Sequence, residues 1–258
     1  MIVLALLVCS AGAAQAGAWT QKRGHWQVIT TTIYGDAPTA FDGKGNTGIS
    51  LQFDKALLLN AAEYGLTNRI TLLLNTETAY ARSHLAPSPR VKGLDNAYEG
   101  GARFLLSSRH GMFSVQASYK SAGAFNFSVS ANSRVAGSAA ELRFLYGGNF
   151  KLAGRDGFFD LQAGQRFLSA PRANETPLDL TAGLWLTPSR MVMLQNFNVI
   201  GGGDGQPPYG YFRSHKLEVS VVQRLTKRLL VQAGVFYSPL GQNALRERGV
   251  VLALWTQV

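Results

Sequence analysis

The sequence contains almost no cysteine. Its one cysteine, Cys9, lies within the first 16 residues, which we predict are removed from the mature protein. The remaining chain therefore has no thiol for a disulfide, a zinc–thiolate site or a cysteine nucleophile. The alternative is a lipoprotein with Cys9 as its first mature residue, but Val8 is bulkier than the small residue that such a processing site prefers. We expect no metal and no cofactor.

Long apolar runs are also lacking. Residues 1–20 carry no charge, residues 2–8 are apolar, and Ala14-Gln15-Ala16 has the small-x-small pattern of a cleavage site. We predict a signal peptide over residues 1–16 and a single domain over residues 17–258. The alternative is a membrane helix, which needs ~20 apolar residues to cross a bilayer. One departure from a signal peptide is that no Lys or Arg precedes the apolar run.

Acidic residues are few relative to basic ones, so the net charge is +10. A basic balance can indicate nucleic acid as the partner, but an exported chain does not meet the chromosome. Anionic lipid headgroups or anionic solutes are the expected partners. The hydrophobic content of 46% and the mean hydropathy of +0.01 are low for a helical membrane protein. They are typical of a membrane barrel, in which every second residue faces water.

The sequence does contain a regular alternation of strand-like segments and connectors. We predict twelve strands, at residues 25–34, 50–64, 69–82, 96–107, 112–124, 138–149, 157–169, 176–186, 190–200, 212–224, 229–239 and 249–257. The predicted short connectors are 65–68, 108–111, 151–156, 187–189 and 225–228. The predicted long connectors are 35–47, 83–95, 125–137, 170–175, 201–211 and 240–248. Short and long connectors alternate throughout, which is typical of outer-membrane barrels. We therefore predict an all-β fold, a transmembrane antiparallel up-and-down β-barrel of about 12 strands.

A period of two runs along single strands. In residues 138–149, for example, Glu141 and Arg143 share one face, whereas Leu142 and Phe144 share the other. One wet face and one apolar face follow from this period. Because the polar face carries full charges, we place it toward an aqueous lumen. Residues 56–59 and 191–194, which are apolar on both faces, depart from the pattern.

The lumen-lining candidates are Glu63, Glu77, Glu99, Arg103, Lys120, Glu141, Arg143, Asp160, Arg166, Lys216 and Glu218. Aromatic residues near strand ends on the other face are expected to form interfacial girdles: Tyr64, Tyr80, Tyr98, Tyr119, Tyr146, Phe167, Tyr237 and Trp255. Charged rings on a pore wall set ion preference. The alternative is that these charges pair across the strands and fill a narrow lumen.

The segment from Ala62 to Leu72, which contains Tyr64-Gly65-Leu66-Thr67-Asn68, resembles the strand–turn–strand signature of a proteobacterial outer-membrane family, the phenol meta-pathway transporter family. Residues 225–228 resemble a degenerate copy of this turn. The resemblance is specific only at the first turn and loose over the rest of the chain. It implies an outer-membrane barrel that moves hydrophobic or aromatic compounds, and it carries over no substrate-binding residue. The chain departs from many such barrels by ending in Thr256-Gln257-Val258, with Trp255 as its last aromatic residue.

Barrel enzymes that modify lipids need a serine and a histidine within reach of each other. Parity places His215 toward lipid, whereas Ser214 and Ser238 face the lumen, so we predict no catalytic residue and no enzymatic activity. We predict a passive outer-membrane channel or transporter for small, hydrophobic or anionic molecules. The alternatives are a closed structural or surface-interaction barrel and, as a minor one, a lipid-modifying enzyme. The expected partners are outer-membrane lipids, lipopolysaccharide, the barrel assembly machinery and an unidentified solute.

Overall fold

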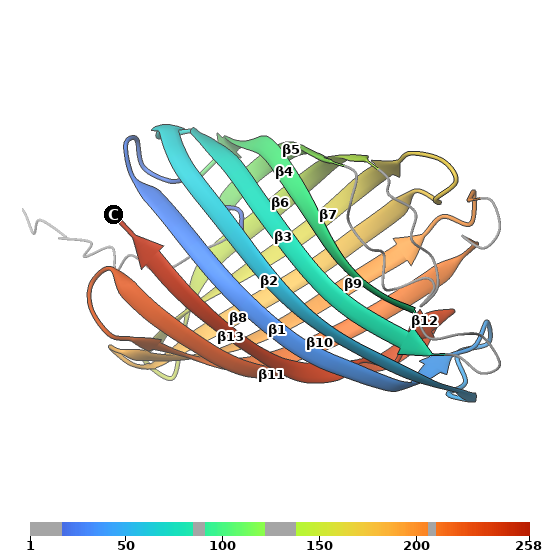
Figure 1. Cartoon of the computed structure of the whole chain (residues 1–258). Coiled ribbons are helices and arrows are strands. Elements are labelled where there is room, and N and C mark those ends of the chain that lie inside the picture. The colour runs from blue at the N-terminus through green and yellow to red at the C-terminus, as the bar shows by residue number, and fades with distance from the viewer. Residues whose placement is uncertain (1–16, 85–90, 122–137, 206–209) are drawn as a thin grey trace, which may run out of the picture.

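The computed structural model describes residues 17–84, 91–121, 138–205 and 210–258 (Figure 1). It contains thirteen strands: β1 (Trp26–Phe41), β2 (Ile49–Thr67), β3 (Ile70–His84), β4 (Val91–Ser107), β5 (Met112–Lys120), β6 (Ala139–Leu152), β7 (Arg155–Leu168), β8 (Glu175–Thr187), β9 (Arg190–Gly201), β10 (Phe212–Arg224), β11 (Leu229–Gln242), β12 (Ala244–Leu245) and β13 (Arg248–Gln257). Within these described ranges, no helix is both long and apolar enough to span a bilayer.

Twelve of these strands close into an antiparallel barrel, which confirms the predicted fold class. Each strand pairs with its neighbours in the sequence, and β1 closes the sheet by pairing with both β2 and β13. The two-residue strand β12 pairs with the last residues of β1. Closure leaves the sheet without an open edge, which satisfies the backbone hydrogen-bonding groups.

The connectors separate the barrel into two ends, which we call the turn end and the loop end. Tight connectors such as Ala153-Gly154 lie at the turn end, where the Trp26 N–H also donates to the Val258 carbonyl. Both residues of that connector have positive φ, as a tight turn between two strands requires. The connector 42–48 between β1 and β2 and the short strand β12 lie at the loop end (Figure 1).

The strands extend further into the connectors than predicted. β1 continues to Phe41 and β2 begins at Ile49, so most of the predicted connector 35–47 is paired strand. The predicted connector 240–248 contains β12. The connector 125–137 lies outside the described residues. The boundary errors arise because a strand that projects beyond a membrane needs no apolar outer face, so the sequence pattern weakens before the pairing ends.

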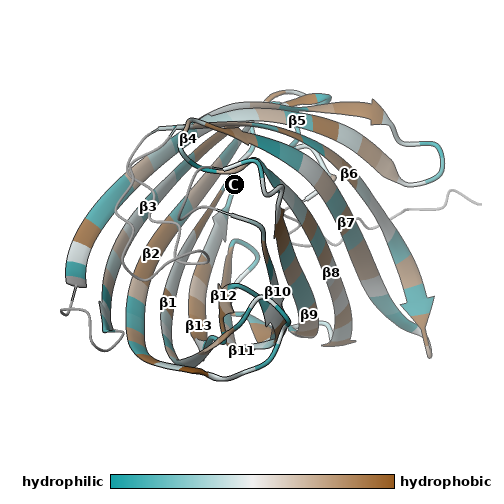
Figure 2. Cartoon of the chain, turned by 90° about the vertical axis from the view of Figure 1, so that its right-hand side faces the viewer, coloured by the Kyte–Doolittle hydropathy of each residue, from teal (hydrophilic) through white to brown (hydrophobic). Residues whose placement is uncertain are grey.

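Burial follows the predicted period of two. In β13, Val251, Ala253 and Trp255 are buried, whereas Leu252 and Leu254 between them are exposed. Figure 2, which looks into the loop end, shows the alternation of hydropathy along the strands. In a closed barrel the shielded face is the inner one, so each strand presents one side chain in two to the interior.

The inner face holds two apolar clusters in addition to its polar residues. The larger one lies near the turn end and contains Phe158, Met191, Met193, Val222, Leu230, Ala253 and Trp255, from five strands. The smaller one lies near the loop end and contains Ala37, Phe53, Ala81 and Leu245. We call the larger group the inner apolar cluster. The sequence did not predict it: Met191 and Met193 lie in the run 191–194, which is apolar on both faces, and Trp255 was assigned to the outer face.

Candidate functional site: the interior of the barrel

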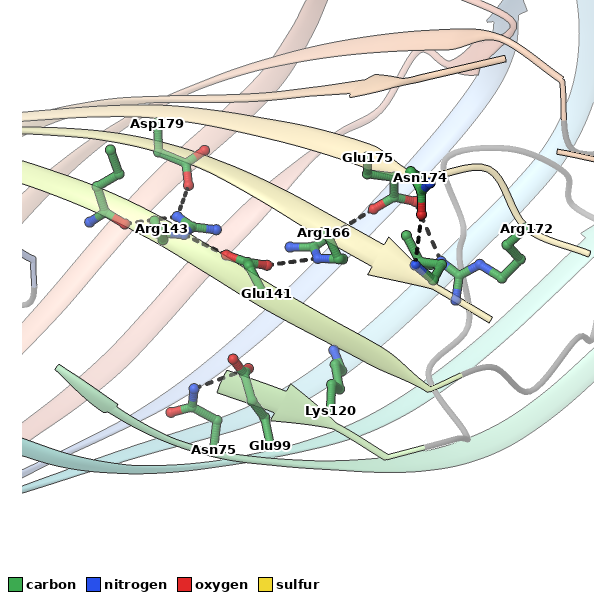
Figure 3. Close-up of polar contacts among 12 residues, drawn as sticks. Asn75, Glu99, Lys120, Glu141, Arg143, Arg166, Arg172, Asn174, Glu175 and Asp179 are labelled. Atoms are coloured by element: carbon green, nitrogen blue, oxygen red, sulfur yellow. Dashed lines mark hydrogen bonds and ion pairs between the residues drawn. The ribbon is translucent and has the colours of Figure 1, made fainter. Parts of the chain in front are cut away.

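The most extended polar group on the inner face is a chain of ion pairs that crosses β6, β7 and β8. We call it the arginine–carboxylate chain; it consists of Asp179, Arg143, Glu141, Arg166, Glu175 and Arg172 (Figure 3). Arg143 lies between two carboxylates, with Nη1 2.5 Å from Asp179 Oδ2 and Nε 2.6 Å from Glu141 Oε1. Arg166 repeats this arrangement, with Nε 2.7 Å from Glu141 Oε2 and Nη1 2.6 Å from Glu175 Oε2.

This chain is electrically balanced, with three guanidinium groups and three carboxylates. Guanidinium–carboxylate contacts of this kind are charge-assisted and directional, so they fix the side chains along the wall. The register explains the arrangement, because Glu141 pairs with Arg166 and Arg143 pairs with Gly164 in the β6–β7 ladder. Gly164 leaves the guanidinium of Arg143 free to reach across β7 to Asp179 on β8.

A second set of charges lies on β3, β4 and β5. Lys120 Nζ is 2.6 Å from Glu77 Oε2, and the Asn75 side-chain amide donates to Glu99 at 3.2 Å. Figure 3 shows Lys120 and Glu99 on the inner side of the wall that adjoins the arginine–carboxylate chain. The two sets together place charged and amide side chains on the loop-end half of this wall, across β3 to β8.

A third group joins the loop end to the opposite wall. Glu247, in the connector between β12 and β13, accepts contacts from Lys55 Nζ at 2.6 Å and Lys216 Nζ at 2.5 Å. Burial acts to raise the pKa of Glu247, but the two ammonium groups outweigh it and lower the pKa to about 2. Lys216 Nζ also lies 5.0 Å from the ring centre of Phe236, a cation–π contact. The connector is thereby tied into the mouth of the barrel.

A further ion pair lies near the turn end and binds the segment before β1. Arg103 Nη2 is 2.9 Å from Glu63 Oε1, and Arg103 Nη1 donates to the Trp19 carbonyl at 2.9 Å. The Gln21 side chain donates to the second oxygen of Glu63 at 3.0 Å, and its backbone N–H donates to Thr71 Oγ1 at 2.8 Å. These partners belong to β2, β3 and β4, so the segment lies along the inner wall.

We call residues 17–25 the inner segment. Its Ala18 carbonyl accepts from the buried hydroxyl of Ser114 at 2.6 Å, and the Trp19 ring packs edge-on against Phe158 at 6.1 Å between ring centres. A Cβ added to Gly147 would come within 2.6 Å of the Trp19 ring, so a glycine is required there. The inner segment thus bridges the polar wall of β2–β5 to the inner apolar cluster.

The two ends of the interior differ in their access to water. The side chains of Lys120 and Arg166 near the loop end retain 29% and 27% of their accessible surface. Met191 and Leu230 in the inner apolar cluster retain none. Inner-face atoms are accessible only where the lumen leaves room for solvent, so the described residues leave a solvent-accessible space at the loop end, which we call the vestibule, and pack tightly at the inner apolar cluster.

All eleven predicted lumen residues are at least partly shielded, and none is among the exposed residues. Nine of them belong to the ion pairs or hydrogen-bonded pairs described above. Asp160 accepts hydrogen bonds from the Gln162 side chain and the Ala18 backbone, both at 2.6 Å. Glu218 accepts from the Gln232 side chain at 3.1 Å, within the group that includes Ser220 and Trp255. The candidates therefore form several separate networks.

Seven of the eight predicted interfacial aromatics lie exposed on the outer face: Tyr64, Tyr80, Tyr98, Tyr119, Tyr146, Phe167 and Tyr237. The eighth assignment, Trp255, was wrong. Trp255 is only 5% exposed, belongs to the inner apolar cluster and donates its indole N–H to Gln232 at 3.1 Å. Proximity to the chain end suggested an interfacial position, but the parity of β13 turns this side chain inward.

Several residues of the networks were not predicted. Asp179 and Glu175 lie on the inner parity of β8, which their spacing from Thr181 and Gly183 could have revealed. Lys55 was hidden in a strand with two apolar faces, and Glu247 in a segment read as a connector. No sequence signal marks the inner segment, because it lies between the predicted cleavage site and the first strand.

Among the described residues, the His215 ring makes no hydrogen bond to a serine. Its Nδ1 contacts the side-chain oxygen of Asn198 on the neighbouring strand β9. The Ser238 hydroxyl is fully buried on β11. In the described part of the chain, His215 and Ser238 therefore do not form a hydrogen-bonded pair of base and nucleophile.

The fold is similar to several solved outer-membrane barrels. An outer-membrane channel from Pseudomonas putida F1 has a TM-score of 0.70 at 14% identity, over 95% of this chain and 100% of that chain. The translocator domain of the autotransporter NalP from Neisseria meningitidis has a TM-score of 0.54 at 11% identity, over 95% and 90%. The transport unit of the autotransporter AIDA-I from Escherichia coli has a TM-score of 0.52 at 11% identity, over 92% and 91%.

No model of a known protein family matches the sequence, and no curated protein matches it. At these identities the structural likeness establishes the fold alone, which is that of an outer-membrane β-barrel. The phenol meta-pathway transporter family that the first turn resembles stays a prediction.

Proposed function

We propose that the protein is a passive channel for small solutes in the outer membrane. The observation that carries this proposal is the solvent-accessible vestibule at the loop end, where the arginine–carboxylate chain and Lys120 keep accessible surface on the inner wall. A barrel that serves only as a scaffold has no need of charged, solvent-accessible side chains inside it. The likeness to an outer-membrane channel from Pseudomonas putida F1 adds support at the level of the fold.

The balance of charge indicates the kind of solute. Every guanidinium of the arginine–carboxylate chain is paired with at least one carboxylate, so the wall has many dipoles and little net charge. Such a wall hydrates a passing solute without binding one sign of ion strongly. We infer that the channel serves small polar molecules, of which anions are one class, with only weak ion selectivity.

The outer face fits the acyl chains and headgroups of a bilayer. Exposed leucine, valine and phenylalanine side chains cover it, with tyrosines among them. We propose outer-membrane lipids and lipopolysaccharide as its surroundings and the barrel assembly machinery as the partner that inserts it. We propose no catalytic role, and the contact between His215 and Asn198 supports this because it engages the ring away from a nucleophile.

Planar-bilayer recording of the purified, folded protein tests the proposal. We expect discrete conductance steps and a reversal potential near zero in a salt gradient. The Arg143→Gln variant leaves Asp179 without its arginine, so its reversal potential should shift toward cation preference. The Lys151→Gln variant, changed at an exposed position near the turn-end terminus of β6, is the matched control and should behave as wild type. Absence of steps in protein that is folded by gel mobility would refute the channel.

A closed barrel is the second candidate, and the inner segment favours it. This segment and the inner apolar cluster fill the turn end, so a solute must pass beside them or displace them. The Arg103→Ala variant removes the bond to the Trp19 carbonyl and separates the candidates. A channel narrowed by the segment should conduct more in this variant, whereas a closed barrel should conduct in neither form.

A further inference from the structure

Asp160 on β7 is a buried carboxylate. Its side chain is 1% exposed, yet none of the ion pairs among the described residues includes it. The two hydrogen bonds to its oxygens come from neutral donors, the Gln162 side-chain amide and the Ala18 backbone N–H. Burial makes the charged form of this carboxylate unfavourable, and Arg103 and Arg143 act on it electrostatically without forming an ion pair with it. The arrangement therefore favours a further positive charge in direct contact with Asp160.

Gly17 lies directly against this carboxylate. A Cβ added to Gly17 would come within 2.3 Å of Asp160 Oδ2 and overlap the carboxylate. The nitrogen of Gly17 is bonded to the same Cα, so it lies within roughly 5 Å of a carboxylate oxygen. The carboxylate thus leaves no room for a side chain at this position.

We propose that Asp160 is the receptor for the free α-amino group of Gly17, which removal of the predicted signal peptide after Ala16 creates. The peptidase hydrolyses the Ala16–Gly17 bond with one water: the C–N bond breaks, a hydroxyl group joins the Ala16 carbonyl carbon, and a hydrogen joins the Gly17 nitrogen. The Ala16 carboxyl releases a proton and the new amine takes one up at neutral pH. The resulting ammonium supplies the ion-pair partner that Asp160 lacks among the described residues.

The surroundings of Gly17 support a docked terminus. The Ser114 hydroxyl holds the Ala18 carbonyl, Arg103 holds the Trp19 carbonyl, and Phe158 packs against the Trp19 ring. These contacts fix the two residues after Gly17 from three sides, so little conformational freedom remains to oppose the ion pair. Maturation thereby locks the inner segment into the turn end of the barrel.

Chemical labelling of the exported and processed protein tests this proposal. The first readout is the mass of the amino-terminal tryptic peptide, which we expect to run from Gly17 to Lys22. The second is the rate at which an amine-reactive anhydride acetylates Gly17 as a function of pH, which gives the pKa of the α-amine. A free α-amine has a pKa of about 7.7–8.0, and a nearby carboxylate raises it.

We expect the wild-type amine to react at least tenfold more slowly at pH 7 than in the denatured protein, with a pKa at least one unit above that of the Asp160→Asn variant. Asparagine removes the charge and keeps one oxygen that can accept from the Ala18 N–H, while the bond from the Gln162 side chain to the other oxygen is lost. The Glu218→Gln variant is the matched control, because Glu218 is another buried carboxyl that does not contact the inner segment; its labelling should match wild type.

Inserting one alanine between Ala16 and Gly17 provides a second variant that keeps Asp160 intact. It moves the new amine by one residue, so the raised pKa should disappear. A mature terminus other than Gly17, or an equal amine pKa in wild type and Asp160→Asn, would overturn the proposal.

Discussion

The turn end and the loop end of the barrel interior are lined by different kinds of side chain. Both are enclosed by strands with one shielded and one exposed face. At the turn end the shielded faces of β7, β9, β10, β11 and β13 form the inner apolar cluster, and the inner segment packs against it through Trp19. At the loop end the shielded face carries the arginine–carboxylate chain, and its side chains keep accessible surface. A filled, dry region should depend on packing, whereas a wet wall should depend weakly on any single ion pair.

The largest expected effect is at the turn end. The Trp255→Ala variant removes a buried indole and its hydrogen bond to Gln232, so we expect the free energy of unfolding to fall by roughly 3–5 kcal/mol. Urea unfolding in lipid vesicles, followed by the gel mobility of folded and unfolded forms, measures the change. The outer-face variant Tyr119→Ala is the control and should lose about 1 kcal/mol. Equal losses would show that the inner apolar cluster contributes no packing energy.

The next effect concerns Glu247, a buried carboxylate at the loop end that contacts the ammonium groups of two lysines. Its pKa of about 2 lies below the unfolded value of 4.5, so its pairing stabilises the fold fully above pH 4.5 and is lost as the pH falls toward 2. The Glu247→Gln variant leaves Lys55 and Lys216 close together, so we expect a loss of roughly 3 kcal/mol at pH 7. The difference from wild type should shrink at pH 3, and a difference that is independent of pH would contradict this account.

A smaller effect is expected within the arginine–carboxylate chain. A double-mutant cycle with Arg143→Ala and Asp179→Ala should give a coupling of about 1–2 kcal/mol, because the pair is only partly shielded from water. The energy should fall further when the salt concentration rises. A coupling energy larger than the loss of unfolding free energy in Trp255→Ala would show that the loop end depends on a single ion pair more than the turn end depends on packing.

The smallest effect is expected at the rim. Arg82 and Asp54 form an ion pair 3.0 Å long whose side chains are 60% and 32% exposed. The corresponding double-mutant cycle should give less than about 0.5 kcal/mol, since exposed pairs gain little over hydration. It serves as the reference for the Arg143–Asp179 cycle, and equal couplings would mean that the lumen wall is no less hydrated than the rim.

Much of the fold was predictable from the sequence, because connector length and a period of two are both properties of local segments. The positions of Arg143, Arg166 and Glu141 on one face followed from parity alone. Their partners did not, because register between strands decides that Arg143 reaches Asp179. The inner segment could not be predicted either, since its contacts with Arg103 and Ser114 depend on the closed barrel around it. Trp255 was misplaced because its nearness to the chain end suggested an interfacial position, although it shares the inward parity of Val251 and Ala253.

The junction between β1 and β13 joins the first strand of the chain to the last. Translocation therefore delivers β1 long before β13, the strand with which it pairs. Until the ten residues of β13 arrive, both edge strands of the sheet carry unpaired N–H and C=O groups, which hydrocarbon cannot solvate. A chain that stops short of Arg248 would consequently be unable to complete its ring, however well its other hairpins form.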